Sequence, residues 1–293
     1  LFARGEYLVV YDAEDQPEPD QLKKALLAFQ RGPRALVCVQ AALNYYNWNE
    51  NFLTRMFTLE YSFWFDYLLP GLDRLGLPIP LGGTSNHFRT TVLRELGGWD
   101  PFNVTEDADL GIRAAMHGYR VGIVNSTTFE EANKQLGNWI RQRSRWIKGY
   151  MQTALVFSRD PYGLVRRAGW KHTLGFALLI GGTPLIFLIQ PISIALTLVW
   201  LFTRNSALEA LFPPVVLYIS LFNLLIGNAL AIYVNMFAVF KRRLHMLVLF
   251  SLFNPLYWVL HSIASFKALG QLFTKPYYWE KTTHGLTRHG AAG

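Results

Sequence analysis

The sequence predicts an α/β domain with a mainly parallel sheet, followed by α-helical transmembrane segments. Three observations support this prediction. Strand-like and helix-like segments alternate over the first half of the chain. Only 16% of the 293 residues are charged, against about 25% in an average soluble domain. Charged residues are scarce mainly in residues 172–293, which contain two acidic residues, Glu209 and Glu280.

The elements of the first half follow from short apolar runs, helical periodicity and capping residues. Asp20 is a candidate cap for the first helix, Gly97 and Gly98 end the third, and Thr105 begins the fourth. The expected elements, in chain order, are a strand at Leu8–Tyr11, a helix at 20–30, a strand at Ala35–Gln40, helices at Asn51–Leu69 and Thr91–Leu96, a helix from Glu106 to His117, and a strand at Arg120–Val124.

Two apolar stretches in the second half are long enough to cross a bilayer, which takes about 20 residues. These predicted spans are Leu174–Phe202 and Pro214–Phe240. A third stretch, Leu244–Phe266, contains Asn254-Pro255, and it either spans or forms a re-entrant pair of half-helices. Basic clusters precede the first span and follow the second, which predicts that residues 1–171 face the cytoplasm.

Charge and cysteine content exclude several classes of protein. The single cysteine, Cys38, excludes a disulfide framework. The net charge of +8 is unevenly divided, because residues 1–171 hold 20 basic and 18 acidic side chains, and residues 172–293 hold 8 basic and 2 acidic ones. The basic excess therefore indicates membrane topology, and no nucleic-acid partner is expected.

A first polar cluster, Asp12, Glu14 and Asp15, follows the first predicted strand. Carboxylates at the end of a strand are suitable ligands for Mg²⁺ or Mn²⁺, which often bridge to substrate phosphates. A second cluster contains Glu106 and Asp107 in the first turn of a predicted helix. Either carboxylate could act as a general base, but an acidic turn and the helix dipole explain the same residues without chemistry.

A third cluster, Gln142, Arg145 and Trp146, has the spacing i, i+3, i+4 that places three side chains on one helical face. An indole offers a flat surface to a sugar ring, and a guanidinium offers a fork to a phosphate. Residues 134–171 also hold nine basic residues among apolar residues at helical spacing. That pattern predicts basic amphipathic helices at an anionic membrane surface, with membrane lipid as a partner.

Taken in this order, the clusters resemble a known family. Asp12-Ala13-Glu14 resembles an Asp-x-Asp metal motif, Thr105-Glu106-Asp107 matches a Thr-Glu-Asp motif, and Gln142-x-x-Arg145-Trp146 matches a Gln-x-x-Arg-Trp motif. Together they resemble the processive family 2 glycosyltransferases of the cellulose synthase and hyaluronan synthase kind. The resemblance covers residues 6–150 and, in general terms, the membrane region. It implies a GT-A-like (Rossmann-like) nucleotide-sugar transferase domain.

The resemblance also implies a reaction and roles for residues. A nucleotide-sugar donor, usually a UDP-sugar, would bind near Mg²⁺ or Mn²⁺ held by Asp12 and Glu14. Asp107 would be the general base of an inverting transfer to a growing β-linked polysaccharide. Substrate contacts are expected from Asp12, Glu106, Gln142, Arg145 and Trp146, with Trp146 stacked on the acceptor. The enzyme would be a multi-pass protein of a bacterial-type plasma (inner) membrane, with its catalytic domain in the cytoplasm.

Two departures from the family pattern affect these expectations. Glu14 stands where the motif has its second Asp, and Asp15 is a competing ligand. The family's first βα units are missing before Leu8, so we expect an N-terminally truncated transferase domain. The expected regions are the cytoplasmic transferase domain at 1–133, interfacial helices at 134–171, a membrane region with two or three spans at 172–273, and a tail at 274–293.

Three other functions remain compatible with the residues. A non-processive transferase acting on a lipid-linked acceptor would use Asp12 and Asp107 without needing Trp146. A glycoside hydrolase would use paired carboxylates and neither nucleotide sugar nor metal. A membrane transport component would use the spans without catalysis.

Overall fold

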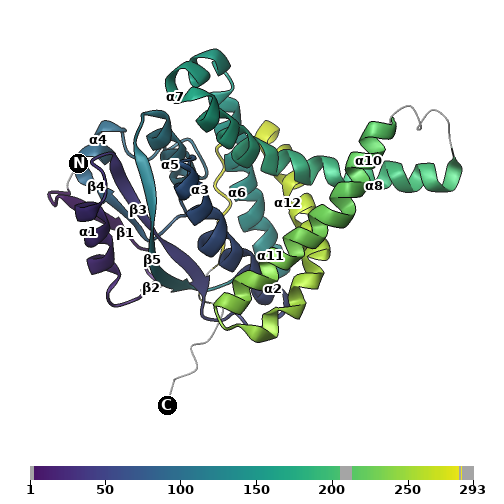
Figure 1. Cartoon of the computed structure of the whole chain (residues 1–293), viewed down its shortest axis with the longest axis horizontal. Coiled ribbons are helices and arrows are strands. Elements are labelled where there is room, and N and C mark those ends of the chain that lie inside the picture. Colours follow the sequence, from purple (N-terminus) through teal and green to yellow (C-terminus); the bar gives the residue numbers. More distant parts are fainter. Residues whose placement is uncertain (1–2, 205–212, 284, 286–293) are drawn as a thin grey trace.

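The computed structural model describes residues 3–204, 213–283 and 285. A twisted sheet with helices on both faces forms one part of the molecule, and long helices extend away from it (Figure 1). The sheet has the strand order β1-β4-β3-β5-β2. Its strands are β1 (Tyr7–Val10), β2 (Gln16–Pro17), β3 (Leu36–Tyr45), β4 (Asn86–Arg89) and β5 (Arg120–Glu130).

The sheet is mixed, so the prediction of a mainly parallel sheet is wrong. In the described part of the chain, β3 and β5 are the parallel pair, with Cys38 opposite Val121. β4 runs antiparallel to both β1 and β3, and β2 runs antiparallel to β5. The alternation of strands and helices along the sequence does not indicate whether neighbouring strands run parallel or antiparallel. Residues 76–85 carry the chain back along the sheet before β4 begins, and this return reverses the strand.

Helices cover both faces of the central strand, and all ten residues of β3 are buried. On one face, α1 (Gln21–Arg31) packs Phe29 against Leu36 and Val39. On the other face lie α3 (Leu69–Leu75), α4 (Thr90–Glu95) and α5 (Glu106–Met116), which contribute Leu69, Leu93 and Leu110 to the main core. The alternation expected from the sequence is therefore confirmed, although β3 and β5 extend well past their predicted ends.

One nearly continuous helical rod follows β3. It consists of α2 (Phe52–Phe63), the π-helical turn η1 (Trp64–Leu68) and α3. Asn51 and Thr54 form a reciprocal capping box that starts α2, and Gly76 ends α3 in the left-handed region at φ +60°. The rod places Glu60 and Tyr61 beside the end of β3, where the candidate site lies.

Three helical segments are long and apolar enough to cross a membrane: Pro161–Thr203, Pro214–Lys241 and His245–Thr274. The first contains α7 (Pro161–Phe176), η2 (Ala177–Gly181) and α8 (Gly182–Thr203), and the second contains α10 (Pro214–Phe222), η3 (Asn223–Gly227) and α11 (Asn228–Lys241). The third contains the 3-10 turns η4 (His245–Leu247) and η5 (Leu249–Phe253), then α12 (Asn254–Thr274). The two predicted spans fall within the first and second segments, and the ambiguous stretch Leu244–Phe266 overlaps the third from His245 onward.

The helix α6 (Leu136–Phe157) differs from the interfacial helix predicted for the start of 134–171. Trp139 and Lys148 are fully buried, and Arg143 is 6% exposed. α6 packs along α12 and also contacts α5 and α8, so its amphipathic pattern reflects internal packing. Basic residues at helical spacing can be buried in this way when each finds a partner within the protein. The interfacial role remains a prediction for α7, where Tyr162 and Trp170 are exposed.

Candidate active site

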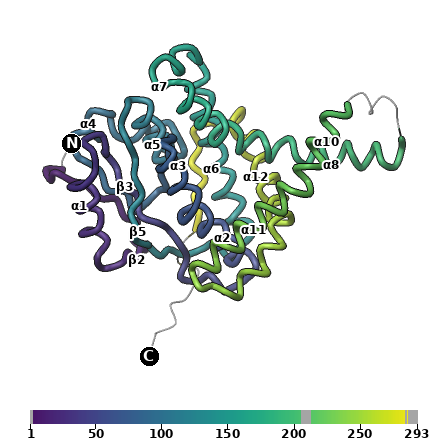
Figure 2. The backbone as a smooth tube through the Cα atoms, viewed as in Figure 1, coloured from purple at the N-terminus to yellow at the C-terminus, as the bar shows by residue number. Residues whose placement is uncertain are grey.

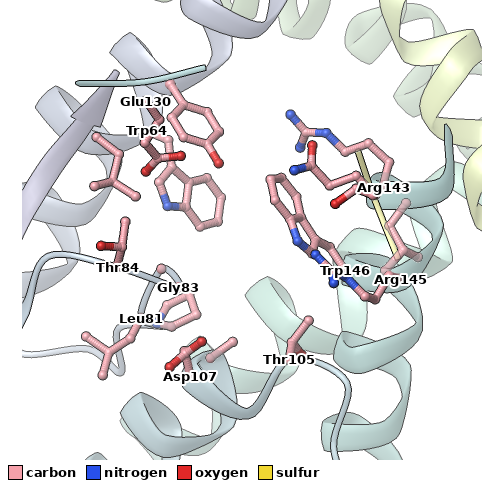
Figure 3. A pocket seen from close by; sticks show the side chains of 18 of the residues that line it. Trp64, Leu81, Gly83, Thr84, Thr105, Asp107, Glu130, Arg143, Arg145 and Trp146 are labelled. Carbon is pink, nitrogen blue, oxygen red and sulfur yellow. The ribbon is translucent and has the colours of Figure 1, made fainter. Parts of the chain in front are cut away.

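A cavity of about 660 Å³ opens where β1, β3 and β5 end. Figure 3 shows Trp64, Thr84 and Glu130 on one side of it and α6 side chains on the other, with Asp107 between them at the base. The structure brings together every site residue that the sequence predicted. The predicted residues that line the cavity are Asp12, Glu14, Glu106, Asp107, Gln142, Arg145 and Trp146.

The segment after β1 forms the acidic wall of the cavity. Asp15 Oδ2 accepts a hydrogen bond of 2.8 Å from the Asp12 backbone N–H and a short one from the Thr84 hydroxyl. Asp15 therefore supports the turn that carries Asp12 and Glu14. Burial, together with the charges of Asp12 and Glu14, raises the pKa of Asp15.

The end of β5 adds Glu130 and Glu131 to this wall. Burial raises the pKa of Glu130 well above its usual value, and the charges of Asp15 and Asp12 raise it further. Glu130 Oε1 is buried without a hydrogen-bond partner among the described residues. Such crowding of carboxylates disfavours their ionisation and would be relieved by a cation.

The acidic wall has the chemistry of a divalent metal site that shares its ion with a substrate. Oxygen ligands suit Mg²⁺ and Mn²⁺. Within residues 3–204, 213–283 and 285, no three His, Cys, Asp or Glu side chains are grouped to hold an ion by themselves. Mg²⁺ is commonly held by one or two carboxylates plus substrate phosphates. The residues thus fit a cation that is completed by a bound phosphate.

Asp107 lies in the first turn of α5 and faces the cavity. Its Oδ1 accepts a hydrogen bond of 2.6 Å from Trp99 Nε1. Burial raises the pKa of Asp107 to about 7, the Glu106 charge acts in the same direction, and the Trp99 bond opposes both. Asp109, two residues further along the helix, instead pairs with Arg113 at 3.0 Å. The purely structural interpretation of the acidic turn therefore suits Asp109 but leaves Asp107 available for chemistry.

The start of α5 is locked to α6, which fixes the distance between Asp107 and the α6 side chains. Gly149 packs so closely on Thr105 that a Cβ at this position would overlap the threonine side chain. Asn103 Nδ2 donates to Thr153 Oγ1 at 2.8 Å, and the Val104 N–H donates to Gln152 Oε1 at 3.2 Å. The Thr105 hydroxyl makes no capping bond to the helix, so its side chain acts as a packing contact.

The α6 face presents the three predicted side chains to the cavity. Gln142 Oε1 accepts a hydrogen bond of 2.8 Å from Asn133 Nδ2, which leaves its own amide N–H₂ group to donate. The Arg145 guanidinium lies 4.3 Å from the centre of the Trp279 ring, and its Nε is buried without a hydrogen-bond partner in the described structure. Trp146 is partly buried, with Tyr61 stacked near it at 6.5 Å between ring centres.

The C-terminal tail is a part of the site that the sequence did not assign. Trp279, Lys281 and Thr282 line the cavity. The tail, coloured yellow in Figure 2, runs back beside α6. Lys148 Nζ donates to the carbonyls of Lys275 and Tyr278 at 3.3 and 2.7 Å.

Other cavity residues were also missed by sequence reasoning. Glu130 and Glu131 follow a strand that was predicted to end at Val124, and a longer strand would have placed this acidic pair at the sheet edge. Glu60 lay inside an aromatic-rich helix, where a single carboxylate gave no signal. His261 belongs to α12 and lines the cavity together with Phe187 of α8.

Comparison with known proteins relates this geometry to sugar transfer. Residues 7–269 match the family described as glycosyl transferase family group 2. The chain is 29% identical over 145 residues to the probable glucomannan 4-beta-mannosyltransferase 7 of Oryza sativa subsp. japonica, covering 49% of this chain and 25% of the relative. It is 28% identical over 144 residues to the probable glucomannan 4-beta-mannosyltransferase 11 of Arabidopsis thaliana, covering 49% and 32%.

A solved structure has the same fold. The mannosyltransferase PcManGT from Pyrobaculum calidifontis, in complex with GDP-Man and Mn²⁺, matches 93% of this chain and 64% of its own, with a TM-score of 0.56 and 18% identity. The fold is therefore GT-A-like, with a mixed sheet followed by helices long and apolar enough to span a membrane. The chain spans about a quarter to a third of the length of the two plant relatives. This chain belongs to glycosyl transferase family group 2.

Proposed function

We propose that this chain carries out inverting transfer of a sugar from a nucleotide-sugar donor to a hydroxyl of a growing β-linked polysaccharide. The observation that carries the proposal is the position of Asp107. Its carboxyl group, with a pKa of about 7, lies in one cavity with an acidic wall and an aromatic platform. A general base works best when its pKa is near the working pH.

In the proposed reaction, the acceptor hydroxyl oxygen attacks the anomeric carbon of the donor while Asp107 takes the hydroxyl proton. The new C–O bond forms on the face opposite the diphosphate, whose bond to the anomeric carbon breaks. The diphosphate leaves with the bonding electron pair, and the anomeric configuration inverts. The carboxylate form of Asp107 is required, so a pKa near 7 makes the rate dependent on pH in the neutral range.

The donor side of the site is assigned to Asp12, Glu14, Glu106, Gln142 and Arg145. Asp12 and Glu14 would hold Mg²⁺ or Mn²⁺, which when bound would neutralise charge on the diphosphate. The unpartnered Nε of Arg145 supports a phosphate contact from the opposite wall. Glu106 lies beside the Arg145 charge, and the Gln142 amide is placed to donate to either substrate.

On the acceptor side of the cavity, we assign Trp146 as the ring on which the end of the growing chain stacks. A stacked acceptor end that remains bound after each transfer supports processive synthesis.

We place residues 1–171 in the cytoplasm of a bacterial-type cell, with the three long apolar helices in the plasma membrane and α7 in contact with membrane lipid. The clusters Arg166-Arg167 and Lys241-Arg242-Arg243 support this orientation.

A donor panel tests the function. Membranes from cells expressing the protein in its natural full length are incubated with radiolabelled UDP-glucose, UDP-N-acetylglucosamine and GDP-mannose. The family resemblance favours a UDP-sugar, and the GDP-Man bound to the archaeal neighbour favours the guanine nucleotide. Incorporation of one label into a long β-linked product supports the proposal. A single added sugar on a lipid would contradict processivity, and no incorporation from any donor would contradict the proposed function.

A further inference from the structure

One carboxylate in the cavity wall, on helix α2, is contacted by side chains from two other helices. Glu60 of α2 receives two hydrogen bonds from the Arg143 guanidinium of α6, one of 2.6 Å from Nη1 to Oε1 and a shorter one from Nη2 to Oε2. The Tyr257 hydroxyl of α12 donates to Glu60 Oε2 at 3.0 Å, and His261 Nε2 lies 3.7 Å from Oε1. Glu60 therefore connects α2, α6 and α12 at one point.

The carboxylate is held in its ionised form. Burial by itself would raise the pKa of Glu60, but the Arg143 charge and the contact with His261 lower it to about 2. The pair is therefore an ion pair throughout the neutral range. Charge-assisted, two-pronged bonds between a guanidinium and a carboxylate also fix the relative orientation of both groups.

Arg143 lies among aromatic rings, including the ring that faces the acceptor side of the cavity. Its guanidinium carbon is 4.3 Å from the ring centre of Phe57, 4.7 Å from that of Trp146 and 5.4 Å from that of Trp139. Each contact is a cation–π interaction, and such interactions are strongest where water is excluded. The indole of Trp146 is thus supported by a charged group whose own position is set by Glu60.

The same cluster reaches the long apolar helices. Trp139 Nε1 donates to the Tyr257 hydroxyl at 3.2 Å. The His261 ring stacks on Phe187 of α8, with 4.8 Å between ring centres. A continuous set of contacts therefore runs from α8 and α12, through Glu60 and Arg143, to Trp146.

We propose that Glu60 and Arg143 are positioning residues for the acceptor: their ion pair, in which Arg143 is buried and Glu60 reaches the cavity, fixes the Trp146 ring at the cavity wall and thereby sets the affinity for the acceptor chain. The proposal rests on the proposed function, because it takes the acceptor to be a sugar that stacks on Trp146. Neither residue takes part in the chemical step. A buried ion pair adds little to stability compared with apolar packing, whereas a small displacement of a substrate-positioning group has a large effect on activity.

The test is a kinetic comparison in the full-length protein, purified in detergent. Initial rates are measured with the donor identified by the panel and increasing concentrations of a β-linked hexasaccharide of the same sugar. Glu60→Gln should raise the KM for the hexasaccharide about tenfold and leave the donor KM and the kcat within about threefold. Tyr257→Phe should change the acceptor KM in the same direction by a smaller factor.

A matched control is Asp66→Asn. Asp66 and Arg242 form another ion pair between the α2–α3 rod and a long apolar helix, and both side chains are about 15% exposed. Neither residue lines the cavity. A general effect of losing a largely buried ion pair would therefore appear in Asp66→Asn as well. Equal acceptor KM values in Glu60→Gln and Asp66→Asn would overturn the proposal while leaving sugar transfer intact.

Two further variants separate positioning from folding. Glu60→Gln/Arg143→Met removes both charges together, so no single charge is left buried, and it should fold even if Glu60→Gln does not. Its acceptor KM should remain raised, and a wild-type value would overturn the proposal. In a Trp146→Ala background, Glu60→Gln should have no additional effect on acceptor KM, because the platform is already absent. If the wild-type protein transfers no sugar, the proposed function fails, and this inference fails with it.

Discussion

Trp99 Nε1 and Asp107 Oδ1 are joined by a hydrogen bond of 2.6 Å at the base of the cavity. The Trp99 ring is itself fixed, because it packs edge-on against Phe88 of β4 at 5.7 Å between ring centres. One carboxylate oxygen is thereby held in place, and the other, Oδ2, lies beside Gly83. Burial favours the neutral carboxyl and the indole favours the carboxylate, and together with the Glu106 charge they set a pKa of about 7.

Replacing Asp107 by Asn removes the group that accepts the proton but keeps an oxygen for the Trp99 bond. We expect the transfer rate to fall about 10²- to 10⁴-fold, which is the usual contribution of a general base. Donor affinity should stay within about threefold. Initial rates and a donor titration measure the two effects. Asp109→Asn is the control, since Asp109 pairs with Arg113 and does not line the cavity. An Asp107→Asn enzyme with more than about a tenth of the wild-type rate would contradict the assignment.

Replacing Trp99 by Phe should shift the pH dependence of kcat/KM to higher pH. Asp107 is inactive when protonated, so the rate of the wild-type enzyme should rise with pH and level off above about 7. The Trp99 bond lowers the pKa of Asp107, and its loss should raise that pKa by about one unit and shift the rising limb to higher pH. The measurement is kcat/KM against pH. Trp170→Phe, at an exposed ring on α7, should leave the limb unchanged. A shift to lower pH in Trp99→Phe would refute the argument.

Metal dependence distinguishes the roles of the three acidic residues after β1. Chelation with EDTA should abolish transfer, and Mn²⁺ should restore it. Asp12→Asn should raise the Mn²⁺ concentration for half-maximal activity at least tenfold, because it removes a ligand. Asp15→Asn should have a smaller effect, since Asp15 already accepts bonds from the Asp12 N–H and Thr84. Glu14→Asp should retain activity because a carboxylate remains. Full activity in EDTA would exclude a metal-dependent mechanism.

The parts of the fold that could be predicted from the sequence are those that depend on local pattern. The starts of α2 and α5, the positions of β1, β3 and β5 and the apolar segments follow from periodicity, turn residues and run length, whereas β2 and β4 were not predicted. Strand direction was not predictable, because the return of the chain over residues 76–85 leaves no periodic signature. The burial of α6 was not predictable either, since basic residues at helical spacing look the same whether they face lipid headgroups or a carboxylate such as Glu60.

The site shows the same division between local and long-range information. Asp107, Arg145 and Trp146 lie in short motifs, so their proximity to Asp12 could be inferred before the structure was known. Glu60 and Arg143 carry no motif of their own, and their pairing across 83 residues depends on how α2 packs on α6. The tail residues were noticed in the sequence, but only the contacts of Lys148 with the tail backbone show that they reach the cavity.

Lys148 provides a test of how the tail is held. Its side chain is fully buried, and its Nζ donates to the carbonyls of Lys275 and Tyr278. Lys148→Met keeps the bulk of the side chain but removes the donor to two part-buried carbonyls, which loses about 1 kcal/mol for each hydrogen bond. We therefore expect the tail to open more often, and tryptic cleavage after Lys281 to become about tenfold faster.

The control for this prediction is Lys171→Met, which removes an exposed lysine whose bond goes to the Leu75 carbonyl, away from the tail. Its cleavage rate should match that of the wild-type protein. Trp279→Ala provides the complementary change, because it removes the ring beside Arg145 but leaves the Lys148 bonds in place. That variant should resist trypsin like the wild type. Equal cleavage in Lys148→Met and Lys171→Met would show that the tail is held chiefly by its other contacts, such as the two bonds between Asn138 and Thr283.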